Sequence, residues 1–314
     1  MKINQAGQTS ALDQALVLFD IYLLTEKRVA QNSFFAYKSD LEQFFVFLAE
    51  IKVSLEDCSK KHCVAFLKWL KDQGIGARSV ARKISTLKLL FSFLHEKYEL
   101  KNVAQDLILP HLEKKLPLYL TEDEITRLFE FVCKDASQRG VRNKVMLYLL
   151  YATGMRISEL LSLTLDSIQF QTGFVTIVGK GKKERSVPLQ KSVLELVRMY
   201  VTTAYHGLLL QAGVEKQKGE NYLFFSVQNK IIKPLSRQTF WGILKKLLVG
   251  AHISKAISPH SLRHSLATHL LHKGVDLRSL QLLLGHEQIA TVQIYTHLEK
   301  SELRKIYDKK HPRA

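Results

Sequence analysis

Apolar residues recur at helical spacing in four blocks along the first third of the chain. The blocks are Leu12/Ala15/Leu16/Phe19/Leu23, Tyr37/Leu41/Phe44/Phe45/Leu48, Val64/Leu67/Leu70 and Val80/Ile84/Leu87/Phe91/Leu94. Ser33 and Ser59 are suited to cap the second and third helices, and Gly74 with Gly76 separates the third from the fourth. The pattern predicts a compact helical bundle over residues 1–110.

A polar segment bracketed by Pro110 and Pro117 follows this bundle. Prolines and polar residues between two apolar regions are typical of a linker, which we place at 111–118. Thr121 then precedes three acidic residues and an apolar one, an arrangement that resembles a helix capping box. A second domain is therefore predicted over residues 119–314.

The first part of this second domain predicts a helix that is interrupted beside an arginine. Residues 143–152 are largely apolar, Thr153 and Gly154 break the pattern, and a helical pattern resumes over 157–163. Arg156 is thus expected at the start of a new helix, next to a sharp turn.

Residues 174–178 alternate in polarity and are rich in β-branched side chains. The glycine- and lysine-rich segment 179–182 can turn, and residues 185–189 can form the returning strand, so the sequence predicts a β-hairpin. Beyond it the pattern is helical almost to the end, apart from a loop near 217–219. The predicted fold class is mainly α, with a helical bundle followed by an α-rich domain that contains a small antiparallel β-sheet.

The composition indicates a folded protein with a strongly basic second domain. Hydrophobic residues make up 46% and charged residues 24% of the chain, and the longest apolar run, 145–152, is too short to cross a bilayer. The N-terminus shows no signal sequence, so a cytosolic protein is expected. Of the net charge of +17, residues 1–110 hold 15 Lys/Arg against 12 Asp/Glu, and residues 111–314 hold 31 against 17. This charge favours nucleic acid over a membrane as the partner, because no basic amphipathic helix is evident.

Four separated segments combine cations, imidazoles and one tyrosine. They are Ala152-Thr-Gly-Met-Arg156-Ile-Ser-Glu-Leu160, Gly179-Lys180-Gly-Lys-Lys-Glu-Arg185, His260-Ser-Leu-Arg263-His264, and Leu284-Gly-His286 followed by Tyr295-Thr-His297. Singly, each is weak evidence, because arginines on helices and lysines in turns are usually solvated. His260 and His264 lie one helical turn apart, but no acidic residue lies between them as the HExxH zinc pattern requires. Three cysteines without a CxxC pair indicate neither a disulfide framework nor zinc, so no metal site is expected.

Together, and in this order, the four segments resemble the tyrosine recombinase, or phage integrase, family, and the bacterial Xer-type site-specific recombinases in particular. The motifs ATGMRISEL, GKGKKER, HSLRHSLATHLL and LLGHEQIATVQIYTHLEK match the family's boxes in sequence and spacing. The resemblance covers essentially the whole chain. It implies that residues 1–110 form a SAM-like core-binding domain, which clamps DNA together with a catalytic domain, and that the chain is an enzyme that cleaves and rejoins DNA.

The resemblance also implies six catalytic residues: Arg156 and Arg263 as the phosphate clamp, Lys180 as a mobile hairpin lysine, His260 and His286 as supporting imidazoles, and Tyr295 as the nucleophile. The chemistry agrees with these roles. Attack on a phosphodiester places extra negative charge on the non-bridging oxygens, which guanidiniums match in two-pronged geometry. With two arginines in place no metal ion or other cofactor is needed. The tyrosine would form a 3′-phosphotyrosine intermediate, and strand exchange would pass through a Holliday junction.

Further basic residues are candidates for DNA contact. They lie on the fourth predicted helix and in the predicted hairpin: Arg78, Arg82, Lys83 and Lys88, and Lys182, Lys183 and Arg185. A solvated helix face explains the first group equally well.

The family resemblance implies a double-stranded DNA recombination site as substrate and a ring of four subunits on two duplexes, with the tail 301–314 docked on a neighbouring subunit. Xer-type enzymes commonly pair two related subunits to resolve chromosome dimers before segregation, under the control of a septal DNA translocase. They act in the cytoplasm, at the nucleoid. The final residues 310–314 favour the XerD-like over the XerC-like group.

Two alternatives stay open at this point. A phage or transposon integrase would use the same chemistry, but we would expect an additional N-terminal arm-binding domain for which this chain is too short. A non-catalytic DNA-binding protein would have no need for Tyr295 alongside both arginines.

Overall fold

The computed structural model describes residues 11–111, 118–179, 183–214 and 221–284. The chain divides into two compact units, Met1–Lys115 and Leu116–Ala314, and each has a hydrophobic core of its own. The boundary lies inside the predicted linker 111–118, of which residues 112–117 fall outside the described ranges. Among the described helices, none is long and apolar enough to span a membrane.

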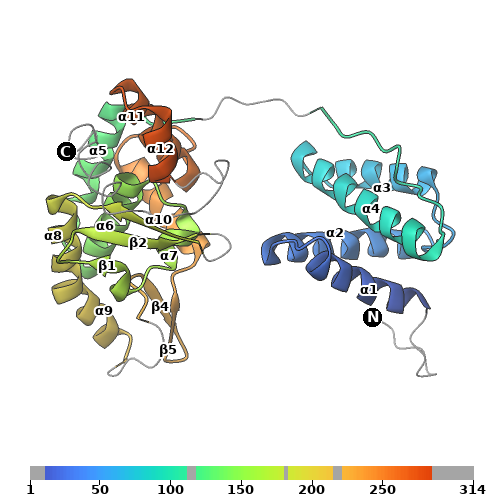
Figure 1. The fold of residues 1–314 in the computed structure, drawn as a ribbon, viewed down its shortest axis with the longest axis horizontal. Coiled ribbons are helices and arrows are strands. Elements are labelled where there is room, and N and C mark those ends of the chain that lie inside the picture. Colours follow the sequence, from blue (N-terminus) through green and yellow to red (C-terminus); the bar gives the residue numbers. More distant parts are fainter. Residues whose placement is uncertain (1–10, 112–117, 180–182, 215–220, 285–314) are drawn as a thin grey trace. The chain divides into compact units, whose positions relative to one another are not determined.

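The regular secondary structure of the described N-terminal unit is helical, with one helix for each predicted apolar block (Figure 1): α1 (Ala11–Thr25), α2 (Gln31–Glu50), α3 (Lys60–Asp72) and α4 (Ala77–Tyr98). Ser59 is the N-cap residue of α3, as predicted. The prediction for Ser33 is wrong, because α2 already begins at Gln31 with Ala30 as its N-cap. The amide of Ser33 donates to the carbonyl of Ala30 at 2.8 Å, so Ser33 lies inside the first turn.

A buried carboxylate joins α2 to α4 in this unit. Asp40 is 2% exposed, and it accepts hydrogen bonds from Lys83 Nζ at 2.7 Å, Arg82 Nη1 at 2.7 Å and Thr86 Oγ1 at 3.0 Å. Lys83 itself is only 3% exposed. The expectation that Lys83 contacts DNA is therefore wrong, because its ammonium is buried against Asp40.

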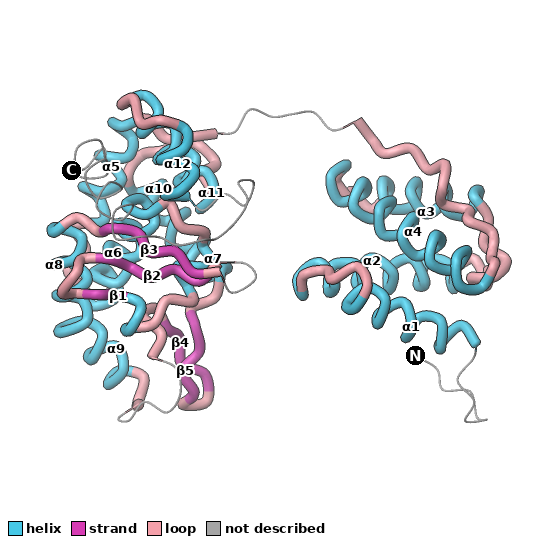
Figure 2. The backbone as a smooth tube through the Cα atoms, in the orientation of Figure 1, coloured by secondary structure: helices cyan, strands magenta, loops and turns pink. Residues whose placement is uncertain are grey.

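The C-terminal unit combines helices with two small antiparallel sheets (Figure 2). Its elements are α5 (Glu122–Val132), α6 (Gln138–Thr153), α7 (Ile157–Leu161), η1 (Leu165–Ser167), β1 (Ile168–Gln169), β2 (Phe174–Val178), β3 (Glu184–Pro188), α8 (Lys191–Met199), η3 (Tyr200–Tyr205), α9 (His206–Gln211), β4 (Phe225–Gln228), β5 (Ile231–Pro234), α10 (Arg237–Gly250), α11 (Pro259–His272) and α12 (Leu277–Leu284). The predicted hairpin is confirmed as β2 and β3, in a sheet of order β1-β2-β3, with Ile177 opposite Arg185. The predicted capping box at Thr121 is also confirmed, since its hydroxyl accepts from the amide of Glu124 at 3.3 Å and its amide donates to that carboxylate at 2.8 Å.

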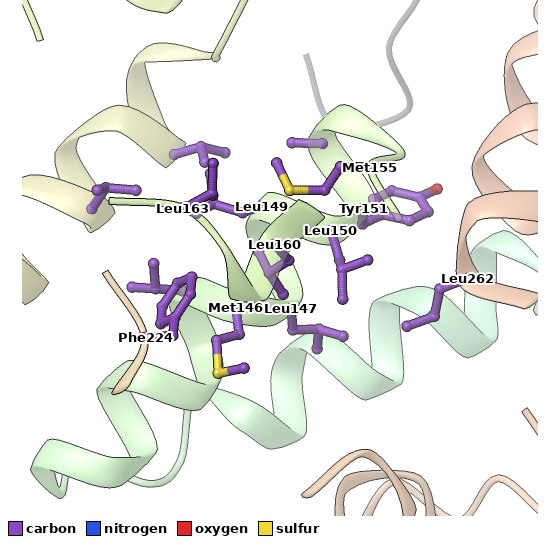
Figure 3. Packing of buried hydrophobic residues seen from close by; sticks show 14 of the residues in the cluster. Met146, Leu147, Leu149, Leu150, Tyr151, Met155, Leu160, Leu163, Phe224 and Leu262 are labelled. Carbon is purple, nitrogen blue, oxygen red and sulfur yellow. The ribbon is translucent and has the colours of Figure 1, made fainter. Parts of the chain in front are cut away.

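Helix α6 lies at the centre of the C-terminal core. Its side chains Met146 and Leu150 pack among Leu160 of α7, Leu262 of α11 and Phe224 (Figure 3). All five are fully buried. The core therefore fixes α7 and α11 around α6, and these two helices carry the arginines of the predicted site.

The β4–β5 hairpin was not anticipated, because the sequence pattern after β3 predicted helices. Its two-residue turn places Asn229 at φ 52° and Lys230 at φ 61°, which is the arrangement of a type I′ turn. Asn is favoured at the first of these positions, but Gly rather than Lys is favoured at the second. The usual turn signal is therefore absent from the sequence.

Replacing Lys230 with glycine is expected to stabilise this hairpin, because glycine removes the cost of about 1 kcal/mol that a β-carbon incurs in left-handed backbone. Amide hydrogen exchange in β4 and β5 should slow by about five-fold in the intact protein. Lys233→Gly, in the strand, is the control and should accelerate exchange. Faster exchange in Lys230→Gly would contradict the turn assignment.

Candidate active site

A sharp turn between α6 and α7 positions Arg156. Gly154 ends α6 with φ +59°, and the amide of Met155 donates to Thr153 Oγ1 at 3.2 Å. Met155 is buried, and Arg156 follows as the N-cap residue of α7. The side chain of Arg156 is 36% exposed. Arg156 therefore lies at the start of a helix beside a sharp turn, as the sequence predicts, and its guanidinium is accessible.

Arg263 reaches the same turn from α11. It is 8% exposed, and its Nη1 donates to the carbonyl of Gly154 at 2.6 Å while its Nη2 donates to the carbonyl of Leu284 at 2.6 Å. Leu284 is the last residue of α12, two positions before His286. One guanidinium therefore connects the turn that carries Arg156 to the helix that leads towards His286.

Glu159 on α7 balances part of the positive charge at this point. Both of its oxygens pair with Arg185 of β3, at 3.1 Å from Nη1 and 2.6 Å from Nη2. Its Oε1 also accepts from Arg156 Nη1 at 2.9 Å, and its Oε2 from the amide of Arg156 at 2.8 Å. Burial alone would raise the pKa of Glu159, but the hydrogen bonds from Arg185 and Arg156 outweigh it and hold that pKa below its usual range. The carboxylate is thus ionised at neutral pH.

The site has more positive than negative charge. Among the described residues, Glu159 pairs with Arg156 and Arg185, and the charge of Arg263 is also close enough to interact with it. Burial, followed by repulsion from Arg156 and Arg185, lowers the pKa of Arg263 to about 10, while Glu159 counteracts this. Arg263 is still protonated at neutral pH, and an anion such as a phosphodiester would relieve the repulsion.

His260 is the second residue of α11 and is exposed. Ser258 caps this helix by accepting from the amide of Ser261 at 3.2 Å. His260 precedes Arg263 by three positions, so the two side chains lie on one face of the helix. The structure therefore places three of the six predicted catalytic residues on α7 and α11, with Arg156 and Arg263 at one turn.

The other three predicted catalytic residues, Lys180, His286 and Tyr295, lie outside the described residues, as does Lys182. Along the chain, the nearest described neighbours of Lys180 and Lys182 are Gly179 and Lys183 at the stem of the β2–β3 hairpin, and the described residue nearest His286 and Tyr295 is Leu284. The amide of Gly179 donates to the carbonyl of Lys183 at 2.7 Å.

The predicted DNA contacts differ in exposure. Arg78 and Lys183 are exposed, and Arg82 remains 42% exposed beside Asp40. Arg185 is not available for DNA, because it is 8% exposed and paired with Glu159. The expectation of a DNA contact at Arg185 is therefore wrong.

Sequence reasoning assigned no role to Glu159. A signal was present, since an acidic residue three positions after a helix start often bonds back to the N-cap amide. Here the N-cap residue is Arg156 itself, so the same carboxylate holds both the backbone and the guanidinium of a predicted catalytic residue. The pairing with Arg185 depends on the tertiary fold.

Gly154→Ala is expected to destabilise the C-terminal unit by about 3 kcal/mol, because a β-carbon adds backbone strain and overpacking. That carbon would lie 2.5 Å from Leu284 Cδ2 and 3.0 Å from Leu266 Cδ2. Gly213→Ala is the matched control, since its φ is +68° with nothing within 4 Å, and it should cost about 1 kcal/mol. Urea unfolding of the intact chain in a Trp69→Phe background, followed by Trp241 fluorescence, measures both. Equal losses would show that Gly154 is needed for its backbone conformation alone.

Comparison with known proteins identifies the family of the chain. Residues 118–302 match the phage integrase family, and residues 16–97 match the phage integrase N-terminal SAM-like domain. The tyrosine recombinase XerD of Staphylococcus saprophyticus is 41% identical over 298 residues, which cover 93% of this chain and 97% of the relative. The tyrosine recombinase XerD of Staphylococcus aureus is 42% identical over 296 residues, with the same coverage of 93% and 97%.

Solved structures share the fold at lower identity. The XerH site-specific recombinase bound to a difH substrate is 22% identical with a TM-score of 0.64, over 88% of this chain and 76% of that one. The Tn1549 transposon integrase in complex with circular intermediate DNA is 16% identical with a TM-score of 0.67, over 93% and 98%. The predicted fold class, a SAM-like helical domain followed by an α-rich catalytic domain, is confirmed. By its matches and its relatives, the chain belongs to the phage integrase family and is a site-specific tyrosine recombinase.

Proposed function

We propose that this recombinase resolves chromosome dimers by exchanging strands at a chromosomal recombination site, through a Holliday junction. The observation that carries the proposal is the meeting of Arg156 and Arg263 at the Gly154 turn, with more positive charge than Glu159 balances. The assignment to dimer resolution is supported by the identity of 41% to 42% to proteins named XerD over 93% of the chain. The transposon integrase shares the fold at 16% identity, so the XerD-like role is favoured over integration.

The two arginines act on the scissile phosphate. Arg156 is accessible and Arg263 is buried beside it. A phosphodiester at the turn would therefore accept hydrogen bonds from both guanidiniums. Such donors stabilise the negative charge that grows on the non-bridging oxygens during attack. The phosphate in turn relieves the repulsion among the guanidiniums.

Tyr295 is the nucleophile in this proposal. Its phenol oxygen bonds to phosphorus, the bond from phosphorus to the 5′ oxygen breaks, and a 3′-phosphotyrosine forms. A free phenol has a pKa of about 10, so it needs a base, and exposed His260 is our candidate to accept its proton. Lys180 donates a proton to the departing 5′ oxygen, while His286 supports the phosphate.

The phosphotyrosine conserves the energy of the broken bond. A 5′ hydroxyl from another strand can therefore attack it, re-form a phosphodiester and release Tyr295 without ATP. The arginines supply the charge stabilisation that a metal ion gives in many nucleases, so cleavage should proceed without added metal. This reversible chemistry suits strand exchange.

Four subunits on two duplexes, with a second related recombinase among them, complete the proposed assembly. The solved relatives include a recombinase bound to its substrate and an integrase dimer bound to a core site, which supports a multimeric complex on DNA. A septal DNA translocase is the proposed activator, and the cytoplasm, at the nucleoid, is the proposed location. The exposed Arg78 and Lys183 are proposed to contact phosphates.

A nicked suicide duplex tests the chemistry. The purified protein is incubated in EDTA with a duplex that carries the recombination site of its own genome. The duplex is nicked so that cleavage releases a short fragment with the freed 5′ hydroxyl, which dissociates and leaves the adduct trapped. Denaturing electrophoresis should show a covalent protein–DNA adduct, and protease digestion with mass spectrometry should place the nucleotide on the peptide that contains Tyr295. Loss of adduct in EDTA would contradict metal-free cleavage. Binding without adduct, even with the partner recombinase present, would favour a non-catalytic DNA-binding protein.

A further inference from the structure

A buried, two-pronged ion pair connects the β2–β3 sheet to the predicted phosphate clamp. Arg185 on β3 is 8% exposed and Glu159 on α7 is 4% exposed. Each carboxylate oxygen accepts from one nitrogen of the Arg185 guanidinium, the geometry in which arginine fixes a carboxylate most rigidly. The orientation of Glu159 is thus determined by a strand outside its own helix.

The same carboxylate determines the position of Arg156. Its Oε2 accepts a hydrogen bond from the amide of Arg156 at 2.8 Å, and its Oε1 accepts one from Nη1 of Arg156 at 2.9 Å. Arg156 is the N-cap residue of α7 with a side chain 36% exposed, and within the described ranges its guanidinium bonds to Glu159. The chain of contacts therefore runs from Arg185 through Glu159 to Arg156.

The hairpin stem lies against this chain of contacts. A β-carbon at Gly179 would lie 3.7 Å from Glu159 Oε1 and 3.8 Å from Arg185 Nη1. Gly179 is the residue before Lys180, and its amide bonds to the carbonyl of Lys183 across the stem at 2.7 Å. The ion pair is consequently located where the Arg156 turn meets the base of the hairpin.

We propose that Arg185 is a positioning residue for DNA cleavage, which orients Arg156 through Glu159 against the base of the β2–β3 hairpin and does not itself contact DNA. The inference rests on the proposed role of Arg156 in holding the scissile phosphate. A purely stabilising ion pair is the competing explanation. Buried pairs often contribute little to stability compared with apolar residues of similar size, and this difference allows the two explanations to be separated.

The decisive variant replaces both partners, Glu159→Leu with Arg185→Met. It removes a buried charge together with its partner, so urea unfolding followed by Trp241 fluorescence in a Trp69→Phe background should stay close to that of the same background without the two substitutions. Adduct formation on the suicide duplex, measured in a single turnover at saturating protein, should nevertheless slow by about 100-fold, because Arg156 loses its fixed orientation. The Kd for the recombination site should change less than two-fold.

Coupling to Arg156 is the second readout. If Arg185 acts through Arg156, then Arg185→Lys should slow cleavage in the wild-type background, because lysine lacks the planar fork, but should add less than three-fold to the defect of Arg156→Ala. Additive defects would contradict the proposal. Arg198→Met is the matched control, since Arg198 pairs with Glu195 at 3.5 Å on the surface, with side chains 50% and 67% exposed, and it should cleave at the wild-type rate.

The outcomes distinguish this inference from the proposed function. A wild-type protein that forms no adduct under any condition would contradict the proposed function and this inference with it. A wild-type protein that forms adduct, with a doubly substituted variant that is stable and equally fast, would overturn the role of Arg185 alone. If the doubly substituted variant is slow only because it is partly unfolded, its urea midpoint will be lowered. That result would also overturn the positioning role.

Discussion

A Tyr295→Phe variant is expected to bind its recombination site with the affinity of the wild-type protein and to form no covalent adduct with it. Phenylalanine keeps the ring and removes the only atom that would attack phosphorus. Loss of a nucleophile typically lowers an enzymatic rate by about 10⁴-fold or more, to a level that electrophoresis of the suicide duplex would not detect. Electrophoretic mobility shift of the uncleaved site measures binding, and the denaturing gel measures adduct.

The chain contains 11 tyrosines, so the variant needs a matched control. Tyr98→Phe removes the hydroxyl of a 39% exposed tyrosine at the end of α4, in the N-terminal unit, and should leave adduct formation unchanged. Adduct that persists in Tyr295→Phe would mean that another residue attacks the phosphate, and the motif-based assignment would be wrong. Loss of binding in Tyr295→Phe would mean that the hydroxyl contributes to recognition of the site.

The six catalytic residues were predicted from the resemblance of four motifs to the tyrosine recombinase family, and local rules add only part of their placement. Gly154, two positions before Arg156, marks a turn, so the position of Arg156 at the start of α7 followed from local rules, whereas Arg263 lies within α11. Their meeting at one turn could not follow from such rules. It depends on a bond from Arg263 to the carbonyl of Gly154, across 109 positions of sequence.

The mistakes concern charged residues that the fold buries. Lys83 and Arg185 look like surface cations, since lysine and arginine are mostly exposed. Each is paired with an acidic residue on another element, Asp40 for Lys83 and Glu159 for Arg185, at sequence separations of 43 and 26. No periodicity predicts such pairs, because their geometry is set by how helices and strands pack.

The fold was predictable where the pattern was long and regular. The helices α1 to α4 and the β2–β3 hairpin were located from apolar spacing, because each of them buries one apolar face in a core. The β4–β5 hairpin, by contrast, is short, and its turn uses Lys230 where glycine is usual. Its sequence alone therefore gives no reason to expect two strands there.

Asp40→Ala is expected to destabilise the N-terminal unit by about 3–5 kcal/mol, the usual effect of removing one partner from a buried ion pair. Lys83 has a side chain that is 4% exposed, and without Asp40 its ammonium would lose its carboxylate partner. Arg82 is 42% exposed and can turn to solvent, so most of the loss should come from Lys83. Asp20→Ala is the matched control, because Asp20 pairs with Lys38 at 3.8 Å on the surface, and it should cost less than about 1 kcal/mol.

Fluorescence can follow this unit separately, because the chain has two tryptophans, Trp69 in α3 and Trp241 in α10. In a Trp241→Phe background, Trp69, which stacks on Phe66 at 5.9 Å between ring centroids, reports urea unfolding of the N-terminal unit within the intact chain. The double variant Asp40→Leu with Lys83→Met should recover most of the lost stability, since it removes the buried charge together with its partner. If it recovers none, the loss in Asp40→Ala arises from Thr86 and Arg82, and if Asp40→Ala costs no more than Asp20→Ala, the buried carboxylate does not hold α2 to α4.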